Sequence, residues 1–144
     1  MFSAKRWAKT DALFPEKLGI ALVRIMVGAV FVMHGYQKWF VWKPAGTVAG
    51  FQGMGFPPTA AYAAMTAELL CGTLLVLGLF TRLAAIPIVA TMAVAIIEVH
   101  LPNGFFLVDK SHGYEYALTL GVAALGLLLA GPGTLSVDSL LSRK

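Results

Sequence analysis

Charged residues are scarce in this chain of 144 residues: only 12% are Asp, Glu, Lys or Arg, while 58% are hydrophobic. A soluble domain carries about 25% charged residues. The shortage excludes an ordinary soluble domain and favours an integral membrane protein with a single domain over residues 1–144. The net charge of +4 fits Lys and Arg beside membrane spans, and we expect the lipid bilayer, not nucleic acid, as the partner.

Cysteine is almost absent, since Cys71 is the only one. A disulfide within the chain and a C-x-x-C redox pair are therefore excluded. The sequence also lacks a Gly-rich phosphate loop, a nucleophile elbow and a nucleotide-binding fingerprint. No motif supports catalysis by this chain alone, and we interpret Cys71 as a small packing residue.

Long apolar runs are what the sequence does contain. A helix of roughly 20 apolar residues crosses a bilayer. The runs that predict membrane spans are 17–40, 60–80, 83–100 and 114–130. We therefore predict an all-α fold, a bundle of four antiparallel transmembrane helices. The first run is longer than the apolar part of a signal peptide, so we expect it to remain as an uncleaved span.

The segments between and around these spans carry weaker signals. Residues 1–16 are amphiphilic and predict a segment on the membrane surface. A short surface helix is expected near 46–53, a tight turn at Thr81-Arg82, and an end to the last span at Gly131 to Gly133. Small residues that favour close helix contacts recur at Ala67-x-x-x-Cys71, Ala117-x-x-x-Gly121 and Gly126-x-x-x-Ala130.

The orientation in the membrane follows from Lys and Arg outside the spans, because these residues concentrate on the cytoplasmic side. If the N-terminus lies inside, the inner set is Lys5, Arg6, Lys9, Lys17, Arg82, Arg143 and Lys144. The outer set is then Lys38, Lys43 and Lys110. Seven against three predicts that both termini lie in the cytoplasm of a bacterial cell and that the outer face is periplasmic.

Several polar residues fall within or beside the spans, where ionisable groups are costly and usually face the interior of a bundle. Glu68 lies near the midplane, and a carboxylate in such an apolar setting can carry a proton. We predict an outward-facing pocket with Glu68 at its floor. Its candidate residues are His34, Tyr36, Lys38, Glu68, Glu98, His100 and Glu115. The alternative is a structural ion pair between Arg24 and Glu68, with the outer residues simply meeting interfacial water.

A metal site or a haem site could be formed by some of the same residues. His34, His100 and His112 with nearby carboxylates could supply metal ligands, but no tight spacing such as H-x-x-x-H occurs. A haem between His34 and His100 is compatible with their similar depth on two spans. The spacing favours neither, so we assign no metal site and leave the cofactor open.

The chain resembles the DoxX family of small four-helix bacterial membrane proteins. The resemblance is carried by His34 to Lys38, by Gly46 to Pro57, by Glu68, by Gly78 to Arg82, and by Gly131 to Asp138. It implies a place in the bacterial inner membrane. The family is named for a subunit linked to thiosulfate:quinone oxidoreduction, and other members are associated with redox-stress complexes and with quinone or catechol handling. Many members have no assigned activity.

Three functions remain open at this point. The first is a membrane subunit or small enzyme of redox metabolism or redox-stress defence that binds a quinone-like molecule through His34, Tyr36, Lys38 and Glu68. The second is a small-solute permease or proton-coupled carrier with Glu68 as its proton site, which would need an oligomer. The third is a non-catalytic assembly or scaffold subunit that binds other membrane or redox subunits.

Overall fold

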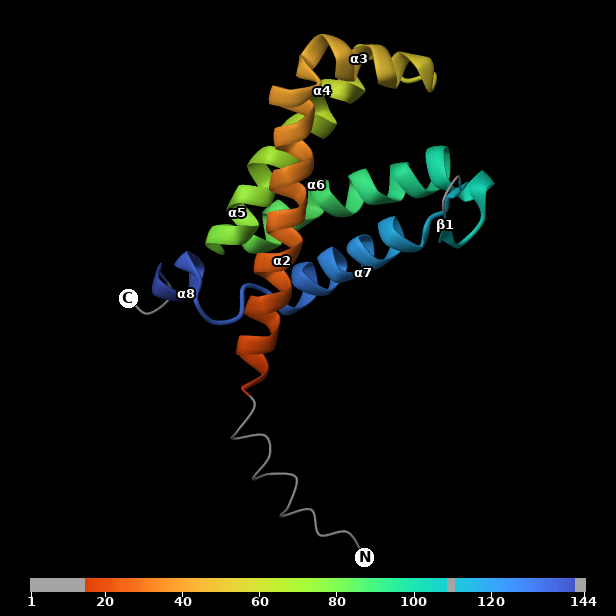
Figure 1. The fold of residues 1–144 in the computed structure, drawn as a ribbon. Helices are drawn as coiled ribbons and strands as arrows, with labels where there is room; N and C mark the ends of the chain where they lie inside the picture. Colours follow the sequence, from red (N-terminus) through yellow and green to blue (C-terminus); the bar gives the residue numbers. More distant parts are fainter. Residues whose placement is uncertain (1–14, 109–110, 142–144) are drawn as a thin grey trace, which may run out of the picture.

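The computed structural model describes residues 15–108 and 111–141, which are mostly helical (Figure 1). The expected surface segment 1–16 lies outside the described residues except for its last two. The helices and strands are α2 (Glu16–Tyr36), η1 (Gln37–Val41), α3 (Lys43–Gly53), α4 (Pro58–Thr66), η2 (Ala67–Cys71), α5 (Gly72–Leu77), α6 (Thr81–Val94), η3 (Ala95–His100), η4 (Leu101–Asn103), β1 (Leu107–Val108), β2 (Ser111–His112), α7 (Glu115–Ala130) and α8 (Val137–Leu141).

Three continuous helices in the described part are long and apolar enough to cross a membrane: Glu16–Val41, Pro58–Leu77 and Thr81–Asn103. A fourth apolar helix, Glu115–Ala130, has 16 residues and is shorter than these three. The four predicted runs thus correspond to apolar helices within a few residues. The predicted surface helix near 46–53 is also present, as α3.

The turn after the second helix falls earlier in the chain than predicted. Thr81 and Arg82 begin α6, and the turn is made by Gly78 to Phe80. Gly78 has a φ of 65°, a left-handed conformation that favours glycine. A Cβ there would lie 2.8 Å from the Arg24 guanidinium, so Gly78 also makes room for a buried arginine.

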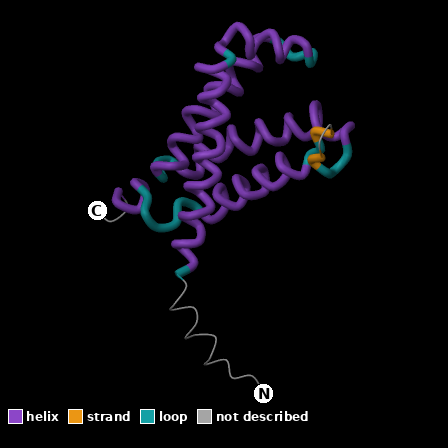
Figure 2. The backbone as a smooth tube through the Cα atoms, in the orientation of Figure 1, coloured by secondary structure: helices purple, strands orange, loops and turns teal. Residues whose placement is uncertain are grey.

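The long helix α2 lies beside η2 and α5, and α6 lies beside α7 (Figure 1). A loop that holds the β1–β2 pair connects the far ends of α6–η3 and α7, and α3 packs on α4 at the top of the view in Figure 2. The core lies where the two pairs meet. Its fully buried side chains include Phe31, Leu75, Ile88 and Leu127.

Two glycines outside the predicted small-residue contacts, Gly28 and Gly72, bring the backbones of α2 and α5 close together. A Cβ on Gly28 would lie 2.7 Å from the Val76 nitrogen, and a Cβ on Gly72 would lie 2.7 Å from the Val32 nitrogen. Backbone contact of this kind is how small residues hold membrane helices together. Of the small-residue contacts that were predicted, the one at Gly126 is wrong, because nothing lies within 4 Å of a Cβ there.

Arg24 is fully buried and binds backbone rather than a carboxylate. Its guanidinium donates hydrogen bonds to the carbonyls of Leu75 and Val76 in the last turn of α5. It also donates to the carbonyls of Pro132 (2.8 Å), Thr134 (3.3 Å) and Leu135 (2.8 Å). We call the segment 131–138 the C-terminal strap. Arg24 thereby fastens the strap to α2 and α5.

Asp138, at the end of the strap, caps the N-terminus of α6. Its carboxylate accepts hydrogen bonds from the backbone N–H groups of Phe80 (2.8 Å) and Thr81 (2.9 Å) at the start of α6. Burial alone would raise the pKa of Asp138, but the hydrogen bonds from Thr81 and Phe80 and the charge of Arg24 outweigh it and hold the pKa below its usual value. The C-terminal strap is therefore bound to the start of α6 as well as to α2 and α5.

Candidate functional site

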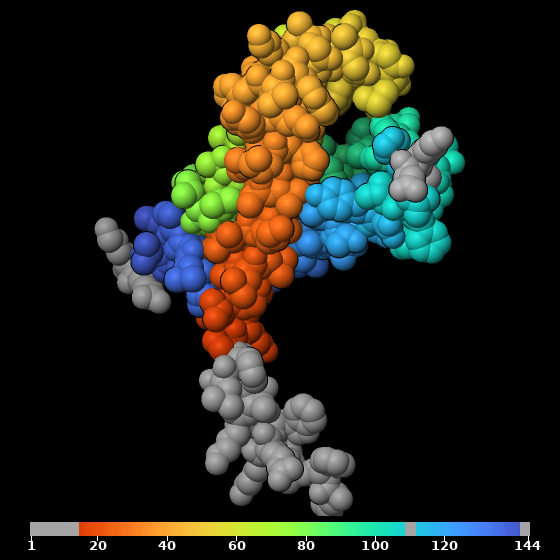
Figure 3. All heavy atoms as spheres, viewed as in Figure 1, coloured from red at the N-terminus to blue at the C-terminus, as the bar shows by residue number. Residues whose placement is uncertain are grey.

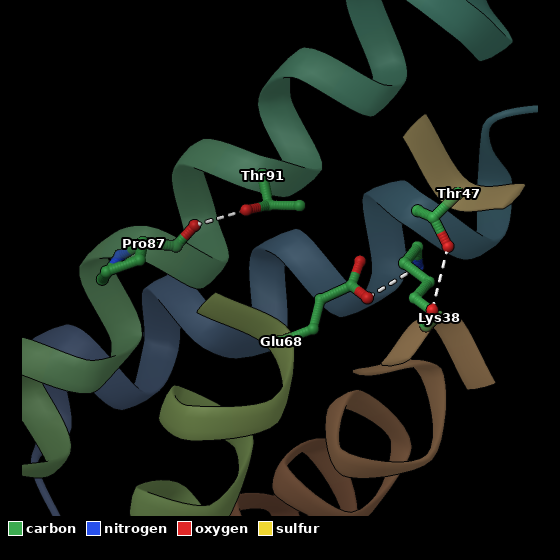
Figure 4. Close-up of polar contacts among 5 residues, drawn as sticks. All are labelled: Lys38, Thr47, Glu68, Pro87 and Thr91. Atoms are coloured by element: carbon green, nitrogen blue, oxygen red, sulfur yellow. Dashed lines mark hydrogen bonds and ion pairs between the residues drawn. The ribbon is translucent and has the colours of Figure 1, made fainter. Parts of the chain in front are cut away.

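Lys38 and Glu68 form an ion pair between the first and second apolar helices. The Lys38 Nζ lies 2.6 Å from the Glu68 Oε2, and only 14% and 6% of the two side chains are exposed (Figure 4). Among the described residues this is the only salt bridge. Figure 4 shows the second carboxylate oxygen of Glu68 turned away from Lys38, and no described residue donates a hydrogen bond to that oxygen.

The expected pair between Arg24 and Glu68 is wrong. Gly35 lies against the backbone of Leu69, so Glu68 is level with Gly35 on α2. Gly35 is eleven residues beyond Arg24, a distance of about 16 Å along a helix. An arginine side chain does not cover that distance, and Arg24 instead faces the end of α5.

Three π-helical segments carry predicted pocket residues. Lys38 belongs to η1, Glu68 to η2, and His100 to η3. A π-helical turn carries one extra residue and is frequently found at functional sites. The hydroxyl of Thr47 donates a hydrogen bond to the Lys38 carbonyl at 2.9 Å, which satisfies a carbonyl in the irregular segment and fixes the backbone that carries the lysine.

A cavity of about 670 Å³ lies beside the ion pair. Figure 3 shows the surface hollowed between the α3–α4 end and the α6–η3 arm. Most of the lining is apolar, with alanines from α4, η2, α6 and η3 and aromatic rings from Phe31, Phe51 and Phe56. The polar lining is small, and its residues are His34, Lys38, Glu68, Thr91, His100 and Tyr116. A mostly apolar cavity with few polar groups is typical of small-molecule sites.

Four of the seven predicted pocket residues line this cavity: His34, Lys38, Glu68 and His100. The other three lie elsewhere. The Tyr36 side chain is exposed and packs on Phe40, with 5.1 Å between ring centroids. Glu98 is exposed and is not part of the lining. Glu115 accepts a hydrogen bond from the Leu107 N–H at 2.7 Å and so braces the loop before α7.

Tyr116, Thr91 and the aromatic residues around α3 also line the cavity and were not among the predicted pocket residues. Tyr116 lies near His34, with 6.5 Å between the ring centroids. The hydroxyl of Thr91 donates to the Pro87 carbonyl at 2.8 Å (Figure 4). One signal for the cavity was present in the sequence, because Ala60, Ala63, Ala64 and Ala67 recur at the spacing of one helix face.

Metal ligands do not gather in the part of the chain that the structure describes. No group of three or more His, Cys, Asp or Glu side chains is placed there to hold an ion. His34 and His100 line the same cavity, but the Nδ1 of His100 lies 2.6 Å from the His112 carbonyl. That ring nitrogen therefore anchors the β1–β2 loop. The arrangement is suited to hydrogen bonding of an organic ligand, with an ammonium as donor and a carboxylate as acceptor.

The apolar helices define a class of protein, the multi-pass membrane proteins. The chain belongs to the DoxX family, whose pattern matches residues 19–101. It is 34% identical to "Uncharacterized membrane protein Rv3486" of Mycobacterium tuberculosis, over 87% of this chain and 82% of that protein. It is 31% identical to "Putative oxidoreductase CatD" of Bacillus subtilis, over 85% of this chain and 86% of that protein.

A further relative is "Inner membrane protein YphA" of Escherichia coli, which is 31% identical over 83% of this chain and 87% of that protein. No solved structure matches the chain. The family assignment agrees with the resemblance inferred from the sequence.

Proposed function

We propose that this protein is a subunit of redox metabolism in the bacterial inner membrane and that its cavity binds a quinone-like molecule. The observation that carries the proposal is the Lys38–Glu68 pair, at 2.6 Å, in the wall of a mostly apolar cavity of about 670 Å³. The relative named an oxidoreductase in Bacillus subtilis supports the redox context. Four membrane spans with both termini in the cytoplasm are part of the same proposal.

The chemistry of the pair suits both redox forms of such a ligand. A quinone oxygen only accepts hydrogen bonds, and the Lys38 ammonium has two protons beyond the one directed at Glu68. A quinol hydroxyl donates, and the second Glu68 oxygen is free to accept from it. The ring itself would lie against the apolar lining, where Phe31 and Tyr116 offer aromatic contact.

The binding test uses the purified protein in lipid nanodiscs and a tailless benzoquinone, with the quenching of tryptophan fluorescence as the readout. Hydrogen bonds to charged groups contribute about 1.5–3 kcal/mol, so losing one corresponds to roughly tenfold or more in Kd. Lys38→Met should weaken quinone binding by that factor. Glu68→Gln should weaken quinol binding more than quinone binding.

The matched control is Glu98→Gln, which removes the charge of an exposed carboxylate that does not line the cavity. Its Kd should equal that of the wild type within twofold. If Lys38→Met and Glu68→Gln both bind quinone and quinol as the wild type does, the ion pair is structural and the proposed site is wrong. Absence of measurable binding by the wild type would also overturn the proposal.

A further inference from the structure

The cavity has two facing walls of small side chains. One wall is the face of α4 and η2 that presents Ala60, Ala63, Ala64 and Ala67. The spacing of these residues is i, i+3, i+4 and i+7, so they form one continuous stripe along the helix. No side chain longer than a methyl group projects from this stripe into the cavity until Glu68 is reached.

The opposite wall repeats the pattern on α6 and η3. Pro87, Ala90, Thr91, Val94 and Ala95 line the cavity at spacings of three and four residues, and the larger Met92 and Val99 of the same helix also contribute to the lining. Small-residue faces usually let membrane helices come together. Here α6 packs against η2, α5 and α7 but makes few contacts with α4, and both stripes remain open, with Ala63 and Ala90 exposed. We call the space between the stripes the alanine slot.

The alanine slot lies at the depth of lipid chains. Both of its walls belong to helices that are long and apolar enough to cross a membrane, Pro58–Leu77 and Thr81–Asn103. One wall lies in the first half of Pro58–Leu77 and the other in the middle of Thr81–Asn103, and an opening between the apolar parts of two such helices faces hydrocarbon rather than water. A ligand that is dissolved in the bilayer can therefore enter from the side.

The cavity is also larger than a bare ring requires. A benzoquinone has eight heavy atoms, which occupy at most about 240 Å³ if each takes the ~30 Å³ share of a water molecule in the liquid. This is well under half of the cavity volume of about 670 Å³. With the ring beside Lys38 and Glu68, the remaining space is the alanine slot, whose walls offer only apolar contact along most of their length.

We propose that the ligand is a membrane-dissolved quinone whose hydrocarbon tail lies in the alanine slot, between the faces of α4–η2 and α6–η3, and reaches the bilayer through it. This inference rests on the proposed function and adds the substrate class and the route of entry. A flat, unsaturated tail suits a slot with methyl groups on both walls. Ala63 and Ala90 are then the residues that decide whether a tail is accepted.

The test compares two benzoquinones with the same ring, one without a tail and one with a two-isoprene tail. Binding is measured in nanodiscs, with ligand concentration expressed per lipid. Ala63→Phe and Ala90→Phe each place a ring in the slot and should raise the Kd of the tailed quinone at least tenfold. The Kd of the tailless quinone should change less than twofold. Ile86→Phe is the matched control, because Ile86 is exposed on α6 and does not line the cavity.

The outcomes separate this inference from the proposed function. If the tailless quinone binds in a Lys38-dependent way and the slot variants leave both ligands unchanged, the site stands and the tail assignment is wrong. The tail assignment is also wrong if correctly folded slot variants lose both ligands equally. A phospholipid that co-purifies with the wild type but not with Ala63→Phe, without discrimination between the two quinones, would make the slot a lipid site. If neither quinone binds to the wild type, the proposed function itself is wrong.

Discussion

Arg24 and Asp138 complement the two helix ends on either side of the same turn. Arg24 donates to the carbonyls of Leu75 and Val76 at the end of α5. Asp138 accepts from the N–H groups that begin α6. The C-terminus of a helix favours a cation and the N-terminus an anion. The charge of each residue therefore matches the helix end that it binds, and the C-terminal strap joins α2, α5 and α6.

Arg24→Leu should destabilise the protein strongly, because it leaves several buried carbonyls without a donor. Each unsatisfied buried group costs about 1–3 kcal/mol. Arg24→Lys should rescue little, since an ammonium cannot reproduce the planar fork of a guanidinium. The measurement is the thermal unfolding midpoint in detergent, with the exposed residue Arg82→Leu as the control.

The same experiment distinguishes Arg24 from an ion-pair partner of Glu68. Since the two residues bind different groups, Glu68→Gln added to Arg24→Leu should bring no recovery, and the two losses should add. A double variant that is more stable than Arg24→Leu would mean that the two charges interact after all.

The carboxylate of Asp138 predicts a loss of stability in acid. Its pKa is lower in the folded protein than in the unfolded chain, where an aspartate titrates near pH 3.9. The folded state is therefore stabilised above about pH 3.9, and this contribution is lost as the pH falls through the folded pKa. Asp138→Asn should lower the unfolding midpoint at pH 7 and flatten its decline below pH 4. An unchanged acid profile in Asp138→Asn would contradict the capping role.

The sequence predicted the helices well because membrane spans depend on local composition. It also singled out Lys38 and Glu68, since charges inside apolar runs are conspicuous. It did not predict that they are partners, because depth estimates from span ends have an error of several residues and each residue shifts a helix by about 1.5 Å. The role of Arg24 could not be predicted from the sequence, for a different reason. Backbone carbonyls that accept its hydrogen bonds come from every residue type and leave no pattern in the sequence.

Gly72→Ala should destabilise the contact between α2 and α5. A Cβ at Gly72 would lie 2.7 Å from the Val32 nitrogen and 3.0 Å from the Gly28 oxygen. Backbone atoms cannot move aside as a side-chain end can, so we expect a cost of about 1–3 kcal/mol from overpacking. Gly19→Ala is the matched control, because nothing lies within 4 Å of a Cβ there. It should leave the unfolding midpoint unchanged or raise it, whereas equal effects of the two substitutions would refute the close contact.

The predicted orientation has a direct test. Seven Lys and Arg residues on one side against three on the other predict that both termini lie in the cytoplasm. A reporter that is active only in the periplasm, fused after Lys144, should give no signal, and a cytoplasmic reporter at the same position should be active. A second pair of fusions within the loop 101–113 should give the reverse result. Periplasmic activity after Lys144 would mean an odd number of spans or the opposite orientation.

The Lys38–Glu68 pair predicts a characteristic double-mutant result. Breaking a buried ion pair by removing one partner costs about 3–5 kcal/mol, because the other charge stays buried and uncompensated, whereas removing both can be nearly neutral. Lys38→Met and Glu68→Gln should therefore each lower the unfolding midpoint, and the double variant should be more stable than the less stable single variant. The double variant should nevertheless lose quinone binding, because no ammonium or carboxylate remains in the cavity.

Recovery of stability without recovery of binding would separate the two roles of the pair. If the two losses simply add, water in the cavity already screens the charges from each other, and the pair contributes nothing to the fold.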